Sequence, residues 1–282
     1  MTPLAWIEGR VLPLAEARIA LEDPGFLVGD GVFETLRARH GKLFHWDLHA
    51  ERLSAGLTAV GIGNEAFAVA QCAAHEVAER AQAGYADDLY VRVQVSRTAT
   101  GEGVVTALAR LLPQYPERLY REGARLGIAV WRRDSADPLA GIKSLSYLPQ
   151  VWARRAAQTA GWDDALILNL AGRVCEAAHG NVVARRGRDL YAPGSEEGAL
   201  DGVTRRVLLA HLADEGYALK KKLSRNELEG ADEVVLTSTL AGVIPVAEIE
   251  GVNRLYAGAA GELASRLAKA YESLLDSETR AA

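Results

Sequence analysis

The chain has 282 residues, of which 49% are hydrophobic and 24% charged, the balance of a globular protein with a sizeable core. Its net charge of −5 argues against a general nucleic-acid binder, although a local basic pocket for one anion remains allowed. No apolar run is long enough to span a bilayer, and the start, MTPLAWIEGR, lacks a signal-peptide pattern. We therefore expect a cytoplasmic protein without nucleic-acid or membrane partners.

The first part of the chain mixes strand and helix patterns. Residues 4–19 indicate a hairpin that turns at Glu8-Gly9, and residues 25–46 indicate two strands joined by a turn at Gly41-Lys42. Helical periodicity follows at 47–62 and 65–84, and then two strand patterns at 88–97 and 104–113. We expect a small N-terminal α+β domain over residues 1–115.

A polar, proline-marked stretch then predicts a linker at 116–124, followed by a larger C-terminal domain over 125–282. Residues 125–133 resemble a strand and 146–161 a helix. Residues 163–193 indicate several short strands with turns at Ala171-Gly172 and Arg186-Gly187. A helix pattern at 201–217, a strand at 233–239 and a closing helix at 258–275 complete the domain.

Cysteine and histidine patterns give no sign of a metal site. Cys72 and Cys175 form no disulfide framework, and we expect both to be buried as small hydrophobic residues in a reducing compartment. One histidine-rich stretch, HGKLFHWDLH, contains His40, His45, Asp47 and His49. Because its spacings match no known ligand pattern, we expect no metal.

Two other patterns have simple structural interpretations. The run GIGNEA at 61–66 mimics a dinucleotide-binding fingerprint, but it follows a helix pattern where that fingerprint follows a strand. We interpret it as a turn between helices. The basic run LKKKLSR at 219–225 is typical of a solvated edge.

Lys143 is the first candidate for chemistry. It lies in GIKSLSYLPQ, between a strand pattern and a helix pattern, where a lysine is either a surface charge or a placed amine. Glu176, 33 residues further on, ends an otherwise apolar strand pattern. A carboxylate in that position tends to be buried and to need a partner.

Three further features would suit an anion. The stretch GALDGVTRR contains a glycine turn at a helix start, where backbone N–H groups are free to bind an anion. The stretch LTSTLAG places the hydroxyl groups of Thr237, Ser238 and Thr239 at a strand exit. Arg52 lies on a predicted helix in HAERL.

Together these residues suit pyridoxal 5'-phosphate. That cofactor needs a lysine to form a Schiff base and an anion beside its ring nitrogen, which makes the ring an electron sink. It also needs a phosphate site built from N–H groups, hydroxyl groups and an arginine. Each feature alone is unspecific, and the set favours this cofactor.

Six motifs make the chain resemble the class IV aminotransferase family, the fold-type IV pyridoxal-phosphate enzymes. In chain order they are GDGVFETLR (29–37), HAERL (49–53), IKSLSYL (142–148), GRVCEAAHGNV (172–182), DGVTRR (201–206) and EVVLTSTLAGVIPV (233–246). The family includes branched-chain aminotransferases, D-amino acid aminotransferases and 4-amino-4-deoxychorismate lyases. The resemblance implies a two-domain α+β and α/β fold like that of D-amino acid aminotransferase, with a cleft between the domains and a homodimer.

The resemblance also assigns roles to single residues. Lys143 would bond to the cofactor and shuttle a proton, and Glu176 would pair with its ring nitrogen. Tyr147 would reach the side of the ring hydroxyl. The phosphate site would comprise Arg52, Val203, Thr204, Ser238 and Thr239. The chain departs from many relatives after the glutamate loop, where it reads HGN, and His179 there is either incidental or part of the pocket mouth.

Two reactions remain open for a small amino-acid-like substrate. Aminodeoxychorismate lyase forms 4-aminobenzoate and pyruvate for folate biosynthesis, whereas a transaminase of branched-chain, D-amino acid or (R)-amine type passes an amino group to a 2-oxo acid. Thr35, which we expect to act in catalysis, stands where branched-chain enzymes have glycine in VFEGIR, and lyases often have threonine there.

Two further stretches bear on the same choice. The ending LAGVIPV is closer to lyases than to the AAEVTPV of branched-chain enzymes. The stretch SRTATGEG at 96–103 lacks the Arg-x-His pair of well-known D-amino acid enzymes. The lyase is therefore favoured, and the transaminase is the alternative. A cofactor-binding protein without turnover would require the loss of the lysine or the glutamate, and both are present.

Overall fold

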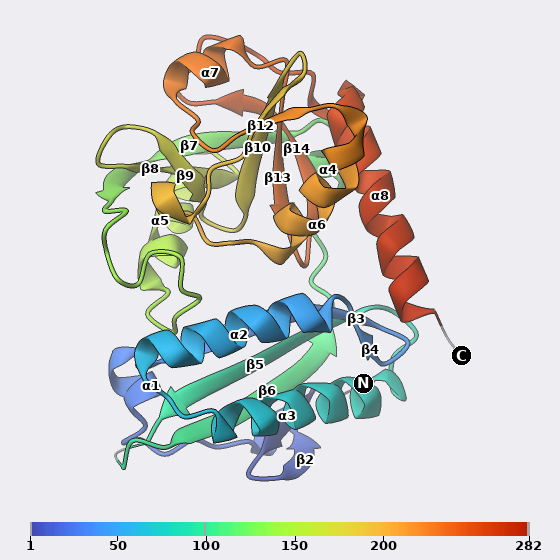
Figure 1. The fold of residues 1–282 in the computed structure, drawn as a ribbon. Helices are drawn as coiled ribbons and strands as arrows, with labels where there is room; N and C mark the ends of the chain where they lie inside the picture. The colour runs from blue at the N-terminus through green and yellow to red at the C-terminus, as the bar shows by residue number, and fades with distance from the viewer. Residues whose placement is uncertain (1, 99, 281–282) are drawn as a thin grey trace. The chain divides into compact units, whose positions relative to one another are not determined.

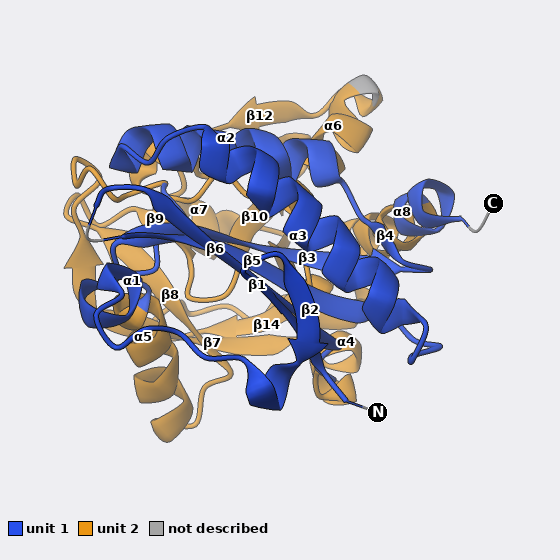
Figure 2. Cartoon of the chain, turned by 90° about the horizontal axis from the view of Figure 1, so that it is seen from below, with its two compact units in different colours: residues 1–114, 142–147, 274–282 blue, residues 115–141, 148–273 orange. Residues whose placement is uncertain are grey.

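The computed structural model describes residues 2–98 and 100–280 and divides the chain into two compact units (Figures 1 and 2). Unit 1 contains residues 1–114, 142–147 and 274–282, and unit 2 contains 115–141 and 148–273. Residues 116–124, for which the sequence predicts a linker, include the short helix α4 (Glu117–Arg121) of unit 2. Segment 142–147, which carries Lys143, groups with unit 1 although it lies within the expected C-terminal domain.

The described part of unit 1 contains a six-stranded antiparallel sheet in the order β2-β1-β6-β5-β3-β4. Its strands are β1 (Leu4–Ile7), β2 (Arg10–Pro13), β3 (Gly31–Arg39), β4 (Lys42–Leu43), β5 (Leu89–Arg97) and β6 (Gly103–Leu111). Glu8 and Gly9 join β1 to β2 with φ of 50° and 75°. Two positive φ values in a two-residue turn match the twist of a hairpin, as the sequence predicts.

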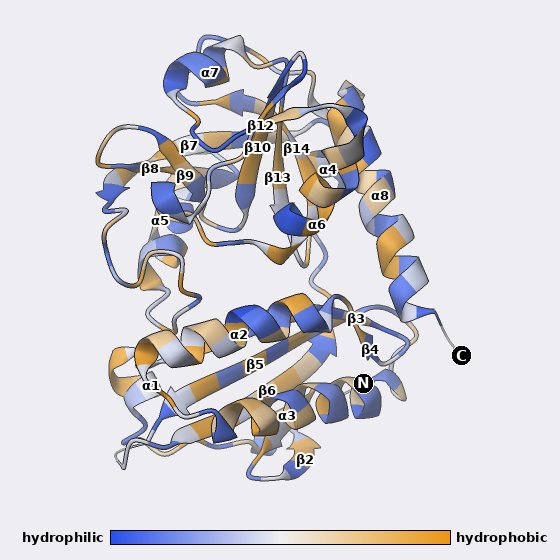
Figure 3. Cartoon of the chain, in the orientation of Figure 1, coloured by the Kyte–Doolittle hydropathy of each residue, from blue (hydrophilic) through white to orange (hydrophobic). Residues whose placement is uncertain are grey.

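Helices α2 (Trp46–Val60) and α3 (Glu65–Gln82) pack on this sheet, and α1 (Pro24–Val28) precedes β3. Both long helices carry apolar and polar residues along their length (Figure 3). On α3 the buried positions are mostly alanines, from Ala66 to Ala81, and Cys72 lies between them on the exposed face. The expectation that Cys72 is buried is therefore wrong, because its place in the helical period points it to solvent.

The described part of unit 2 contains an eight-stranded mixed sheet in the order β12-β11-β10-β13-β14-β7-β8-β9. The strands are β7 (Ala124–Arg133), β8 (Asp164–Asn169), β9 (Val174–Ala177), β10 (Asn181–Arg186), β11 (Asp189–Tyr191), β12 (Ala218–Lys220), β13 (Glu233–Ser238) and β14 (Gly242–Ile249). Strand β12 stands at the end of the sheet and is exposed, which confirms the solvated edge predicted from its lysines.

Further helices of the described residues accompany this sheet: α5 (Leu148–Thr159), α6 (Val203–Leu212), α7 (Arg225–Gly230) and α8 (Glu262–Thr279). Helix α5 packs on β7 and β8. Residues 61–64 form the turn between α2 and α3 that the sequence predicts. Buried Cys175 lies in β9, where burial raises the pKa of its thiol to about 12. Across the described residues, no helix is both long and apolar enough to cross a membrane.

Candidate active site

Lys143 lies in an extended segment that pairs with the start of β3. The N–H of Phe33 donates to the carbonyl oxygen of Lys143 at 2.9 Å, and Ser144 forms an antiparallel bridge with Val32. The Nζ atom of Lys143 lies 4.6 Å from the centre of the Phe33 ring and 5.5 Å from that of Tyr147. The two rings contact each other edge to face, with their centres 5.4 Å apart. The Lys143 amine therefore lies against a packed pair of aromatic side chains.

Thr35 lies on the same face of β3 as Phe33, because side chains alternate along a strand. Its partner across the ladder is Arg92 of β5, whose guanidinium stacks 3.7 Å from the Phe33 ring centre and donates to Gln94. Burial lowers the pKa of Arg92. Arg92 was not predicted from the sequence, since it occupies an ordinary polar position in an alternating strand.

Arg52 reaches from α2 to Glu34 of β3. Its Nε and one terminal nitrogen each donate to a different oxygen of Glu34 at 2.7 Å, and His49 Nδ1 lies 2.8 Å from the same carboxylate. Glu34 and His49 are almost completely buried. Burial alone would raise the pKa of Glu34, but Arg52 and His49 outweigh it and hold that pKa below its usual range. Burial lowers the pKa of His49, and the positive charges of Arg52 and Lys143 lower it further, although Glu34 acts in the opposite direction.

Glu176 lies in β9 of unit 2, one residue before the strand ends at Ala177, and is buried among three donors. Arg133 donates to its Oε1 at 2.6 Å, while the side chain of Asn181 and the backbone N–H of Leu200 donate to Oε2 at 3.3 and 3.0 Å. The sequence predicts a carboxylate at the end of a buried strand, but it does not predict Arg133 and Asn181 as partners. Spacing along the chain does not distinguish these two side chains from their polar neighbours.

Helix α6 begins beside this carboxylate, with Gly202 as its first flanking residue and no side-chain cap among the described residues. A Cβ atom on Gly202 would overlap Oδ1 of Asn181, the residue whose Nδ2 donates to Glu176. Val203 and Thr204 are buried in the first turn. The free N–H groups of such a helix start attract an anion.

The third group in unit 2 is the exit of β13. Thr237 is buried, and its hydroxyl group has no hydrogen-bond partner within the described part of the chain. Ser238 accepts from Ala241 N–H at 3.3 Å, and the carbonyl oxygen of Thr239 accepts from Tyr271 at 2.6 Å. Gly180, next to Asn181, approaches this exit, because a Cβ there would meet the carbonyl oxygen of Thr237 at 2.7 Å.

Within unit 2 the residues fit pyridoxal 5'-phosphate. A buried carboxylate with an arginine partner suits the ring nitrogen, an uncapped helix start suits the phosphate, and the unpartnered Thr237 hydroxyl is a further polar group in the same region of the described chain. Within unit 1, Lys143 carries the amine and Arg52 the guanidinium that the sequence predicts for the cofactor.

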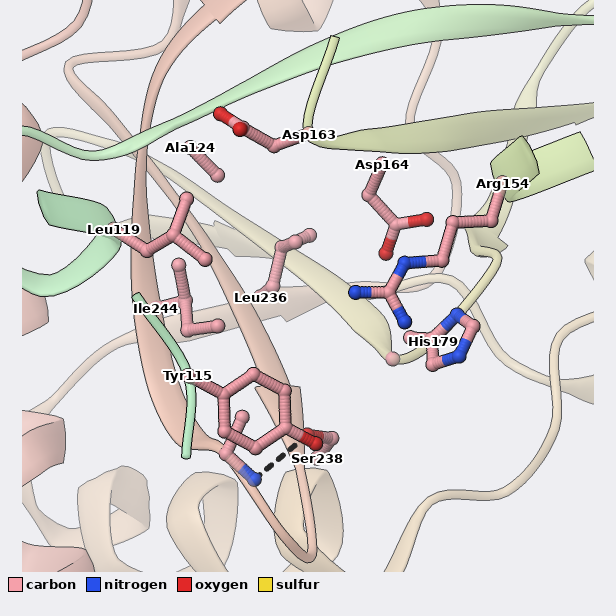
Figure 4. A pocket seen from close by; sticks show the side chains of 12 residues that line it. Tyr115, Leu119, Ala124, Arg154, Asp163, Asp164, His179, Leu236, Ser238 and Ile244 are labelled. Atoms are coloured by element: carbon pink, nitrogen blue, oxygen red, sulfur yellow. Dashed lines mark hydrogen bonds between the residues drawn. The ribbon is translucent and has the colours of Figure 1, made fainter. Parts of the chain in front are cut away.

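A small cavity in unit 2 is lined by His179. It has a volume of about 40 Å³, and Arg154, Asp164 and Ser238 are among its lining residues (Figure 4). Cofactor pockets measure roughly 300–1,000 Å³, so this cavity is too small to hold the cofactor. Burial raises the pKa of Asp164 to about 6 despite the N–H groups of Ala165 and His179 and the charge of Arg154.

Comparison with known proteins identifies the family of this chain. The family model described as amino-transferase class IV matches residues 31–249. An aminodeoxychorismate lyase of Bacillus subtilis (strain 168) is 32% identical over 287 residues, covering 95% of this chain and 94% of its own. A D-alanine aminotransferase of Bacillus licheniformis is 30% identical over 283 residues, covering 96% of each chain.

Solved structures extend the likeness to the whole fold. The branched-chain aminotransferase of Thermoproteus uzoniensis, solved with norvaline, has a TM-score of 0.84 at 26% identity, covering 99% of this chain and 97% of its own. Another branched-chain aminotransferase with the same TM-score was solved with pyridoxamine 5'-phosphate. The fold class, the enzyme class and the cofactor predicted from the sequence are thereby confirmed. The chain belongs to the class IV aminotransferase family, with the fold-type IV architecture and pyridoxal 5'-phosphate as its cofactor.

Proposed function

We propose that this enzyme is a 4-amino-4-deoxychorismate lyase, which forms 4-aminobenzoate and pyruvate as a step of folate biosynthesis in the cytoplasm. The observation that carries the proposal is Thr35, whose side chain shares a strand face with Phe33, the ring that contacts Lys143. A hydroxyl group at this position suits a substrate with a polar ring better than a substrate with an aliphatic side chain. The 32% identity with the lyase of Bacillus subtilis supports the same reaction.

A transaminase is the second candidate, and Arg92 is compatible with it. Its half-buried guanidinium lies opposite Thr35 and over Phe33, where it could bind a carboxylate of an amino acid or 2-oxo acid. The same arginine would also suit a carboxylate of aminodeoxychorismate. The relative named D-alanine aminotransferase is 30% identical, close to the value for the lyase.

The residues of this chain divide the chemistry between them. The bound cofactor supplies an electron-withdrawing ring that stabilises negative charge on the substrate carbon. Lys143 provides the amine that bonds the cofactor, and it moves the proton at the substrate Cα. Glu176, held by Arg133, would face the ring nitrogen and favour its protonated form, and Tyr147, which packs at Lys143, would reach the side of the ring hydroxyl.

The phosphate is proposed to meet a separate group of side chains and N–H groups. Arg52 contributes charge, and Glu34 holds its guanidinium in one orientation. The start of α6 contributes the N–H groups of Val203 and Thr204. Ser238 and Thr239 contribute hydroxyl groups at the exit of β13.

A homodimer is also proposed. Residues 21–28 of unit 1 expose Leu21, Phe26, Leu27 and Val28, each by more than half of its surface. Adjacent large apolar side chains on a surface are typical of a protein contact, whereas scattered ones need no explanation. A second copy of the chain is the partner that the resemblance to this family implies.

The decisive experiment is a product assay. The protein is incubated with chorismate and an aminodeoxychorismate synthase, and separately with a panel of amino acids and 2-oxoglutarate. The lyase proposal expects 4-aminobenzoate and pyruvate in equal amounts from the first mixture, and Lys143→Ala should abolish them. Amino-group transfer in the second mixture without 4-aminobenzoate in the first would replace the lyase by a transaminase.

Thr35→Gly separates the two reactions within one protein. We expect it to lose 4-aminobenzoate formation by about 1–3 kcal/mol in the transition state, the usual cost of one hydrogen bond in a buried site. Side transamination should persist or rise because the pocket gains room. Thr35→Ser is the matched control, since it keeps the hydroxyl group. Equal loss of both activities would show that Thr35 only supports the sheet.

A further inference from the structure

The loop between β11 and α6 contacts every side chain that holds Glu176. The carbonyl oxygen of Gly198 accepts from Arg133 at 2.7 Å, on the same nitrogen that bonds Glu176. The N–H of Leu200 donates to Glu176 at 3.0 Å, and its carbonyl oxygen accepts from Asn181 at 2.8 Å. The positions of residues 198–200 therefore set the direction of the Glu176 carboxylate.

A buried carboxylate fixes the middle of this loop. Glu197 is 1% exposed, and its Oε2 accepts from the side chains of Asn169 and Arg173 at 2.7 Å each. Asn169 and Arg173 are themselves joined by two hydrogen bonds that involve their backbones, across the β8–β9 turn. A buried charge is retained only with such partners, because desolvation would otherwise cost several kcal/mol.

The far end of the loop has its own anchor. Arg205 of α6 donates to Asp201 at 2.7 Å and to the carbonyl oxygen of Pro193. These contacts fix the start of α6 independently of Glu197. The loop is thus held at two places, one beside the helix start proposed for the phosphate and one beside Glu176.

We propose that Glu197 is a positioning residue for Glu176. It acts through the backbone of Gly198 and Leu200, which keep Arg133 and Asn181 in contact with the Glu176 carboxylate. The inference rests on the proposed pairing of Glu176 with the ring nitrogen. Losing the Glu197 charge then changes the chemical step and the electronic state of the ring. The affinity for the phosphate is kept, because Arg205 still fixes the start of α6 where the phosphate is proposed to bind.

The test is Glu197→Gln in the holoenzyme, because glutamine keeps the shape but presents an amide to two donors. We expect kcat to fall about ten- to hundredfold, the effect of disturbing one charge-assisted contact. The visible absorption of the bound cofactor and its pH dependence should shift in the direction seen for Glu176→Gln. The dissociation constant of pyridoxal 5'-phosphate should change by less than about threefold. A tenfold change would correspond to about 1.4 kcal/mol, so the expected change in binding free energy is well below that value.

Glu196→Gln is the matched control, since Glu196 is the exposed neighbour in sequence and should leave all three measurements unchanged. Glu197→Asp should recover part of the rate, because it restores the charge. An unaltered spectrum and rate in Glu197→Gln, with Glu176→Gln still altered, would overturn the inference and leave the proposed function intact. An unaltered spectrum in Glu176→Gln would instead overturn the role of Glu176.

Arg173→Gln keeps the proposal testable if Glu197→Gln does not fold. The Arg173 side chain is 34% exposed, so its replacement disturbs the core less while removing one of the two donors to Glu197. A spectral shift in the same direction as Glu176→Gln supports positioning. A lower melting temperature with an unchanged spectrum would show that the contact only stabilises the loop.

Discussion

Glu34 shows how single residues in this protein combine charge with burial. A carboxylate without solvent would normally gain a proton, yet the two contacts from Arg52 and the one from His49 lower its pKa. The ion pair of Arg52 with Glu34 also restricts the Arg52 guanidinium, because the two hydrogen bonds fix one edge of that group on the carboxylate. A fixed guanidinium loses less conformational entropy when it binds a phosphate.

Arg52→Ala is expected to weaken the binding of pyridoxal 5'-phosphate far more than it slows the saturated enzyme. One charge-assisted contact is worth about 1.5–3 kcal/mol, roughly a ten- to hundredfold change in dissociation constant. The variant should also melt at a lower temperature, because Glu34 loses its arginine partner. Dialysis and reconstitution measure the affinity, with Arg52→Lys as the charge-preserving control. Unchanged affinity would remove Arg52 from the phosphate site.

Asp164 is a buried carboxylate whose pKa is raised, in contrast to the lowered pKa of Glu34. Burial moves it from 3.8 to about 6, and neighbouring Asp163 adds to the effect. Arg154 of α5 lies beside the carboxylate (Figure 4), and its charge opposes the rise together with the N–H groups of Ala165 and His179. A raised acidic pKa means that the folded state binds the proton more tightly. The contribution of Asp164 to the free energy of unfolding therefore falls as pH rises from about 4 to about 6 and is constant above that.

Asp164→Asn is expected to remove this pH dependence. The difference between 3.8 and about 6 corresponds to about 3 kcal/mol, which sets the largest gain in stability expected above pH 6. Near pH 4 the variant and the parent should have similar stability, since Asp164 is then neutral. Urea unfolding across this pH range checks the prediction. A parallel profile for Asp164→Asn and the parent would contradict the prediction.

At the level of elements, the start of α6 joins the two functional groups of unit 2. Gly202 lies against Asn181, and Asn181 bonds both Glu176 and the carbonyl oxygen of Leu200. Asn181 is 4% exposed, so it has little room to move away from an added methyl group. The helix start proposed for the phosphate and the carboxylate proposed for the ring are therefore coupled through one amide.

Gly202→Ala should lower both cofactor affinity and rate, because the new Cβ would overlap Asn181 Oδ1 and displace that side chain. Overpacking of this kind typically costs about 1–3 kcal/mol. The double variant Gly202→Ala with Asn181→Ala provides the control, since removing the amide relieves the clash. We expect its loss to be smaller than the sum of the two single losses. Additive losses would show that the two residues act separately.

Local periodicity was enough to predict most elements, including the β1–β2 hairpin, α2, α3, β5, α6 and β13. It could not predict that residues 142–147 pair with β3, because that contact joins segments about 110 residues apart. The same limit applies to Glu197, which stands in a polar run typical of an exposed turn. Its burial follows from tertiary contacts with Asn169 and Arg173, and no local pattern encodes them.

For the whole molecule, the chain order and the compact units do not coincide. Segments 142–147 and 274–282 return to unit 1, the latter through contacts of Asp276 with Arg39, Glu278 with His45 and Arg280 with Lys42. Sequence patterns assign domains to continuous stretches, so they predict one boundary near residue 115. The residue types needed for cofactor chemistry were predictable, but the partners that orient them, such as Arg133 and Asn181, required the three-dimensional structure.

The largest-scale prediction concerns assembly. We expect the protein to have twice its chain mass of 30.3 kDa in solution, because residues 21–28 expose Phe26, Leu27 and other apolar side chains. Burying one leucine contributes about 1.5–3 kcal/mol, so Leu27→Ser should weaken the dimer roughly ten- to hundredfold. Sedimentation velocity over a range of concentrations measures this change.

Leu255→Ser is the matched control, since Leu255 is a leucine of similar exposure in unit 2, at 77% compared with 62% for Leu27. It should leave the dissociation constant of the dimer unchanged. A dimer that responds to Leu255→Ser and not to Leu27→Ser would move the interface away from residues 21–28. A parent protein that sediments as a monomer at every concentration would exclude the dimer, and the exposed side chains of α1 would then need another partner.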